Sequence, residues 1–193
     1  MDPTGPACRM GRMSRATLPG ARSPIVGFDQ PFELLAACHD RLRQRLDLLA
    51  RLVEHLGDHG PDAAARDAAA DVLRYFDVAA PHHHEDEERH LVPVLKTSGN
   101  PADRAAAQRL LDDHAQIQAA WQGLRPLLLQ LEGDPAALRR AARHFIALHG
   151  PHLALEDDLV YPAAQQRIGA AEAVAIGTEM ARRRGATRPD PAS

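Results

Sequence analysis

The sequence predicts an all-α protein that folds as an up-down-up-down antiparallel four-helix bundle, and three observations support this. Alanine, leucine and arginine are plentiful while aromatic residues make up only 4% of the chain, which favours helices over strands. Three groups of helix-breaking residues, at 57–61, 98–101 and 132–135, divide the chain into four long segments. Apolar side chains in each segment recur with a period near 3.6 residues.

The apolar stripes predict which face each helix turns toward the core. They comprise, segment by segment, Leu35, Leu42, Leu46, Leu49, Val53 and Leu56; Leu73, Phe76, Ala80, Leu91 and Val94; Leu110, Ile117, Trp121, Leu124 and Leu128; and Leu138, Phe145, Leu148, Leu155 and Leu159. Short connections between long helices make neighbours antiparallel. A shorter fifth helix is expected at about 163–183, on the outside of the bundle.

The two ends of the chain differ in composition from the bundle. Residues 1–29 are rich in proline, glycine and arginine and show no helical period, so we expect a flexible tail. Residues 185–193 have the same character and are expected to form a flexible C-terminus. The bundle itself is predicted to span 30–184.

Composition and charge exclude several classes of protein. The formal net charge is −3 and basic residues are scattered among acids, which argues against a nucleic-acid partner. There is no apolar run of the ~18 residues that a membrane span requires, and no apolar signal core near Met1. Two cysteines without CxxC spacing predict no disulfide framework. We expect a cytoplasmic protein that binds no membrane.

Each predicted helix carries one histidine on its apolar stripe. These are His39, His83, His114 and His152. Counted from the end of the bundle that they share, all four lie about 9 to 13 residues in, a spread of roughly 6 Å at 1.5 Å per residue. The antiparallel arrangement therefore predicts that the four imidazoles meet in one layer.

Two carboxylates belong to the same layer. Glu87 follows His83 by four residues and Glu156 follows His152 by four, so each acid shares the face of its histidine one turn along. Buried carboxylates cost several kcal/mol unless positive charge compensates them, and neutral imidazoles cannot do so. Imidazole and carboxylate ligands without thiolate suit iron, manganese or zinc, and paired carboxylates in a helix bundle are typical of two-metal sites.

The ordered set of one His, HxxxE, one His and HxxxE resembles the hemerythrin-like proteins, also called the HHE cation-binding domain. The matching stretches are CHDRL, HHEDEERHLVP, DDHAQI and HLALEDDLVYP, and the likeness runs from about residue 24 to 185. The resemblance implies a non-haem centre of two iron ions (Fe²⁺ or Fe³⁺) joined by an oxo or hydroxo bridge. In such a centre Glu87 and Glu156 would bridge the irons and the four histidines would cap them. Iron is chosen through the resemblance, with manganese and zinc as alternatives.

This chain departs from the blood-pigment hemerythrins in its third helix. Those proteins have HxxxH there, whereas His114 has Leu110 four residues before it and Gln118 four after it. Four imidazoles, two bridging carboxylates and one bridging oxygen supply ten of the twelve positions of two six-coordinate ions. We expect His149 to add a ligand or to hydrogen-bond to one, and we keep His84 in the same role. His84 is nevertheless expected to turn away from the stripe, as are His82, Asp86, Glu88 and His90, which would be solvated or would support the ligands.

Two functions remain open from the sequence. The first is a binding protein that takes up O2, NO or iron itself for sensing, storage or scavenging. The second is an enzyme, either an oxidase or peroxidase or a factor that repairs damaged iron centres. No motif identifies a redox partner, and binding is the leading hypothesis. Pro81 and Pro151, just before two ligand histidines, are expected to kink their helices.

Overall fold

The computed structural model describes residues 27–186, and within this range every regular element is helical. The elements are α1 (Pro31–His59), α2 (Ala63–Arg74), α3 (Ala80–Lys96), α4 (Pro101–Leu129), α5 (Pro135–Leu155), α6 (Tyr161–Gln165) and α7 (Ala170–Arg183). The π-helical turns η1 (Tyr75–Ala79) and η2 (Glu156–Val160) join α2 to α3 and α5 to α6. The predicted all-α class is confirmed. The predicted tails fall mostly outside the described residues.

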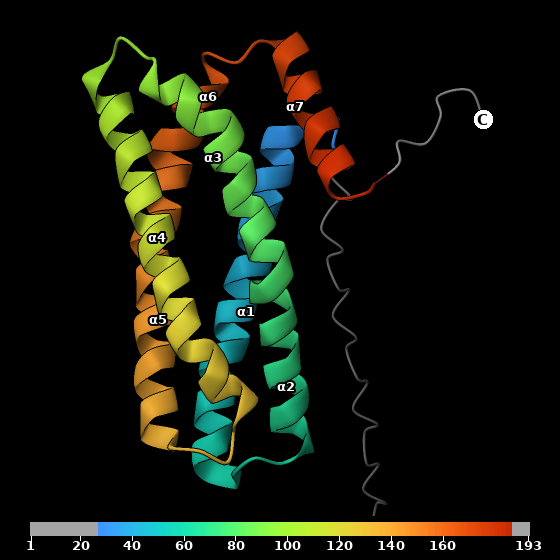
Figure 1. Cartoon of the computed structure of the whole chain (residues 1–193), viewed down its shortest axis with the longest axis vertical. Helices are drawn as coiled ribbons and strands as arrows, with labels where there is room; N and C mark the ends of the chain where they lie inside the picture. The colour runs from blue at the N-terminus through green and yellow to red at the C-terminus, as the bar shows by residue number, and fades with distance from the viewer. Residues whose placement is uncertain (1–26, 187–193) are drawn as a thin grey trace, which may run out of the picture.

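Four long helical runs form a bundle: α1, α2 with α3, α4, and α5 with α6 (Figure 1). Contacts join α1 to α2, α3 to α4, α4 to α5 and α1 to α5, so each run packs against its neighbours in the sequence. The helix α7 lies outside the four runs, beside the first turns of α1 (Figure 1). None of the helices in the described range is long and apolar enough to cross a lipid bilayer.

Short polar residues set the points at which the runs begin. Asp62, Asn100 and Asp134 each precede a helix, and the side chain of each accepts a hydrogen bond from a backbone N–H in the first turn. Such caps satisfy N–H groups that have no partner within the helix. Pro101 and Pro135 follow two of these caps at the first helical position, where the missing N–H costs nothing.

Each of the two π-helical turns is followed closely by a proline. η1 ends two residues before Pro81, and η2 ends two residues before Pro162. Proline has no N–H and its ring crowds the carbonyl four residues back, so a wider turn relieves both effects. The kinks expected at Pro81 and Pro151 stay predictions; the chain passes through the π-helical turn just before Pro81, whereas α5 runs through Pro151 as one α-helix.

The turn η2 also changes which side chains face the core. Leu159, placed on the apolar stripe by the sequence, is 56% exposed, while Val160 is fully buried. The placement of Leu159 was therefore wrong. The prediction failed because a π turn inserts about one extra residue, which rotates the side chains that follow it relative to those of a continuous α-helix.

The core consists of two apolar clusters separated along the bundle axis. One contains Leu49, Trp121 and Phe145, and the other contains Leu95 and Leu110. Along every run, the predicted ligand residues lie between a member of one cluster and a member of the other. The histidine layer is therefore enclosed by hydrocarbon on both sides.

Candidate metal site

Side chains from all four runs meet in two adjacent groups that could each hold an ion. One group is His84, His114 and His152, and the other is His39, His83, Glu87 and Glu156. Within each group the ligand atoms lie within 4.8 Å of one another. The structure thus brings together all four stripe histidines and both carboxylates that the sequence singled out.

Each carboxylate faces a histidine of both groups. Glu156 Oε1 lies 2.9 Å from His152 Nε2, and Glu156 Oε2 lies 3.0 Å from His39 Nε2. Glu87 Oε2 lies 3.3 Å from His114 Nε2, and Glu87 Oε1 lies 3.6 Å from His83 Nε2. The two carboxylates therefore span the space between the groups, as a pair of bridging ligands would.

The histidine His84, which the sequence analysis kept as a possible additional ligand, lies beside the stripe histidines. Its ring stacks on that of His114, with centroids 4.0 Å apart and planes 11° apart, and it approaches His152 edge-on at 5.5 Å. The expectation that His84 turns away from the core face was wrong. His83 and His84 are adjacent on α3, and the facing helices enclose both of them, so the inward face here is wider than a single stripe.

The histidines from α1 and α4 are oriented by acids that come directly after the two carboxylates. His39 Nδ1 lies 2.9 Å from Asp157 Oδ1, and His114 Nδ1 lies 2.8 Å from Glu88 Oε1. An acid at Nδ1 fixes the ring and directs Nε2 toward the site, which is the usual arrangement behind a metal-bound histidine.

The buried polar atoms of the site fit metal ions better than they fit one another. Within residues 27–186, ring nitrogens of His83, His114 and His152 and carboxylate oxygens of Glu87 and Glu156 have no hydrogen-bond partner. Although these atoms lie close together, they do not meet in hydrogen-bond geometry. Buried carboxylate oxygens without partners are costly, and cations at this place would satisfy them and the free imidazole nitrogens together.

Proton affinities in the site follow from burial and from contacts between acids and imidazoles. Burial lowers the pKa of His114, but contacts with Glu156 and Glu87 outweigh it and raise the pKa to about 10. Burial also lowers the pKa of His39, and contact with Glu156 again outweighs it, so the net shift is upward. For Glu156 itself, contacts with three histidines overcome burial and hold its pKa well below the ordinary value. Without metal, protons on imidazoles balance the buried carboxylate, and cations can replace them.

Comparison with known proteins agrees with this geometry. A family model described as the hemerythrin HHE cation binding domain matches residues 30–164, which is more than half of the chain. The chain belongs to this family. A relative named only as an uncharacterized protein, from Haemophilus influenzae, is 28% identical over 159 residues, covering 81% of this chain and 91% of that one.

In this hemerythrin-family chain, His149 lies outside both groups of ligand atoms. Its Nδ1 donates a hydrogen bond to the Phe145 carbonyl at 2.8 Å, and its ring packs edge-on against the Phe145 ring at 4.6 Å. Burial lowers the pKa of His149 to about 4, so the ring is neutral at pH 7. The structure places it in the apolar cluster beside the site, 6.4 Å from His152 between ring centroids.

One polar residue at the site was missed by the sequence analysis. The Tyr161 hydroxyl donates a hydrogen bond to Glu87 Oε1 at 2.6 Å and lies 2.9 Å from His39 Nε2. Burial and the charges of Glu87 and Glu156 hold the pKa of Tyr161 well above its usual value in the metal-free protein. Its position in the motif LVYP, after the second HxxxE, was visible in the sequence. A continuous helix, however, would have given it a different face.

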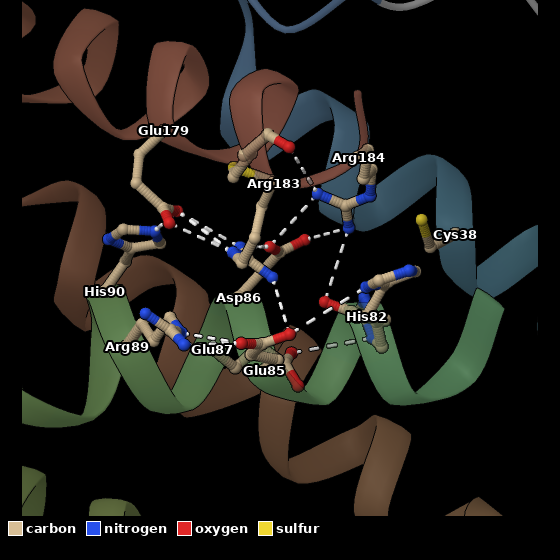
Figure 2. A network of polar contacts seen from close by, with 12 residues as sticks. Cys38, His82, Glu85, Asp86, Glu87, Arg89, His90, Glu179, Arg183 and Arg184 are labelled. Atoms are coloured by element: carbon tan, nitrogen blue, oxygen red, sulfur yellow. Dashed lines mark hydrogen bonds and ion pairs between the residues drawn. The ribbon is translucent and has the colours of Figure 1, made fainter. Parts of the chain in front are cut away.

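The helix α7 of this hemerythrin-family bundle is held against α3 by a buried acid. Figure 2 shows Arg183 and Arg184 converging on Asp86, which both of them contact in ion pairs. Asp86 was expected to be solvated or to support the ligands, and the first alternative was wrong, because Asp86 is only 1% exposed where Arg183 and Arg184 cover it. At the same place Arg184 Nη2 donates to the His82 carbonyl at 3.3 Å. The α3 segment that carries the ligand residues is therefore tied to the C-terminal helix.

Proposed function

We propose that this hemerythrin-family chain holds two iron ions in the described site. His84, His114 and His152 would bind one ion, and His39 and His83 the other, with Glu87 and Glu156 bridging the two. The observation that carries the proposal is that each carboxylate faces one imidazole from each group, at 2.9–3.6 Å. Manganese and zinc accept the same ligands, and iron is preferred because of the family.

A count of donors identifies where a further ligand would bind. With His84 included, five imidazoles, two bridging carboxylates and one bridging oxygen supply eleven of the twelve positions of two six-coordinate ions. The ion between His84, His114 and His152 would be complete. The ion at His39 and His83 would have one imidazole fewer and would keep one open position.

The function that this arrangement supports best is binding of a small diatomic ligand, O2 or NO, at the His39 and His83 ion, for sensing or scavenging. When bound, the iron pair supplies one-electron redox chemistry and a place for such a ligand. The chain itself supplies an enclosed site between two apolar clusters, which excludes water. Glu88 and Asp157 hold the imidazoles of His114 and His39 in position.

The proposal includes an antiparallel up-down-up-down order of the four runs. Short connections between the runs and the contacts between consecutive runs support this order. In that arrangement α1 and α4 each contribute one lone histidine, while the other two runs each contribute an HxxxE pair.

Elemental analysis and NO binding test the proposed function. Chain reconstituted anaerobically with Fe²⁺ should hold two ions, and adding NO to it should produce a visible charge-transfer spectrum. Glu87→Ala and Glu156→Ala should each lose more iron than Glu88→Ala, because only the first two lie between the groups. One ion or none per chain would contradict the two-ion site, and a two-ion protein that ignores NO for hours would favour iron storage instead.

A further inference from the structure

The Tyr161 hydroxyl reaches the site from the apolar cluster that covers one side of it. Tyr161 is the first residue of α6, is 6% exposed, and belongs to the cluster that includes Leu95 and Leu110. Its ring stacks against that of His39, with centroids 5.3 Å apart and planes 22° apart. The turn η2 just before it rotates the chain so that Tyr161 and Val160, rather than Leu159, face inward. The hydroxyl therefore lies among ligand atoms.

The distances between these atoms also fit ligands on one ion. Two ligand atoms at right angles around an ion with bonds of about 2.1 Å lie roughly 3 Å apart. The Tyr161 oxygen is 2.9 Å from His39 Nε2 and 2.6 Å from Glu87 Oε1, and His39 Nε2 is 3.0 Å from Glu156 Oε2. An ion at bonding distance from His39 and Glu87 would also have the phenol oxygen as a neighbour.

The hydroxyl also lies on the side of the site that lacks a donor. His39 is in the group with two imidazoles, and the other group has three. The contacts of the Tyr161 oxygen within the site are with His39 and Glu87, both in the two-imidazole group.

We propose that the Tyr161 oxygen is a ligand of the His39 and His83 ion and fills its remaining position. The proposal rests on the proposed two-iron centre and deepens it. On metal uptake the phenol proton leaves to water, as protons leave other ligands. The centre then has twelve filled positions, and a small ligand binds only by displacing Tyr161. The phenol thus controls access to the ion.

Spectroscopy of the iron-loaded full chain tests the inference. The diferric protein should show a phenolate-to-iron charge-transfer band in the visible region, with phenolate ring modes in its resonance Raman spectrum. Tyr161→Phe should lose both signals while keeping two irons per chain. It should also bind azide, used as the probe anion, at least about tenfold more tightly than the unmodified chain, because the position is then open.

The chain provides a matched control, because Tyr75 is its other tyrosine. The Tyr75 hydroxyl donates to the Cys38 carbonyl at 3.4 Å, away from the ligand atoms, so Tyr75→Phe should leave the band and the azide affinity unchanged.

Three results would overturn the inference. The first is a two-iron protein without phenolate modes, which needs no variant. The second is a band that survives Tyr161→Phe, and the third is equal azide affinity with and without the phenol. A chain that takes up no iron would overturn the proposed two-iron centre as well, so the two failures are distinguishable.

Discussion

Replacing Asp86 by asparagine tests whether the C-terminal helix contributes to the stability of the bundle. Asp86 is 1% exposed, and the side chains of Arg183 and Arg184 that contact it are 13% and 21% exposed. Removing one partner of a buried ion pair typically costs 3–5 kcal/mol, because the remaining charge stays buried. Since both guanidinium groups retain some access to water, we expect the lower end, about 3 kcal/mol of unfolding free energy.

For a chain of this size, about 3 kcal/mol corresponds to a fall of roughly 6–12 °C in Tm. The assay is thermal unfolding of the metal-free protein at pH 7, followed by circular dichroism, so that metal content cannot influence the result. Glu85→Gln is the matched control. Glu85 also pairs with Arg183, at 2.9 Å, but it is 36% exposed, and such pairs contribute about 1 kcal/mol or less. If Asp86→Asn melts within about 2 °C of the unmodified chain, the reasoning about the buried pair is refuted.

Three further outcomes concern the metal site. His84→Ala should lower iron affinity by at least roughly 10–100-fold, because removing even a residue that hydrogen-bonds to a ligand has an effect of this size. His82→Ala should leave the iron affinity unchanged. Equal affinities of the two variants in a competition titration would show that His84 is not a ligand. Because the pKa of His114 is raised to about 10, iron must displace a proton there at pH 7. Apparent Fe²⁺ affinity should therefore rise with pH and fall as imidazoles become protonated, and a flat profile between about pH 6 and 9 would contradict this. Iron at about 100 times its Kd should stabilise the fold by about 2.7 kcal/mol and raise Tm by several degrees in calorimetry, whereas an unchanged Tm would argue against binding to the folded chain.

Much of the site could be predicted because helical periodicity and depth are properties of sequence. His39 lies between Leu35 and Leu42 on its stripe, and the structure buries all three on one face of α1. The four histidines lie at similar distances from the end of the bundle that their helices share, so histidines from distant segments come together. Neither step requires knowledge of side-chain packing, which is why both could be argued from spacing alone.

The features that the sequence could not predict depend on the backbone or on the facing helix. Tyr161 reaches the site only because η2 rotates the chain by about one residue, and a continuous helix would have turned Leu159 inward instead. His84 was kept only as a possible ligand, and its place among the ligand atoms, with the ring of His114 from another helix stacked on it, depends on how the helices face one another. A proline follows each π turn by two residues, at Pro81 and Pro162, but Pro151 lies inside α5 with no π turn before it. Proline alone is therefore an insufficient predictor.

The two HxxxE segments suggest why the two groups of candidate ligands differ in composition. Aligning His83 with His152 also aligns Glu87 with Glu156 and the two acids that orient the lone histidines, Glu88 and Asp157. Among the positions at which the segments differ, two bear on the ligands: His84 corresponds to Leu153, and Val92 corresponds to Tyr161. The first difference adds an imidazole to one group, and the second places a phenol against the other. In the proposed centre each of these two differences would supply a donor to a different ion, and the ion with two imidazoles would be the one beside the phenol oxygen. In the proposed centre, ligand exchange is therefore expected at this ion, because the other is enclosed by three histidines.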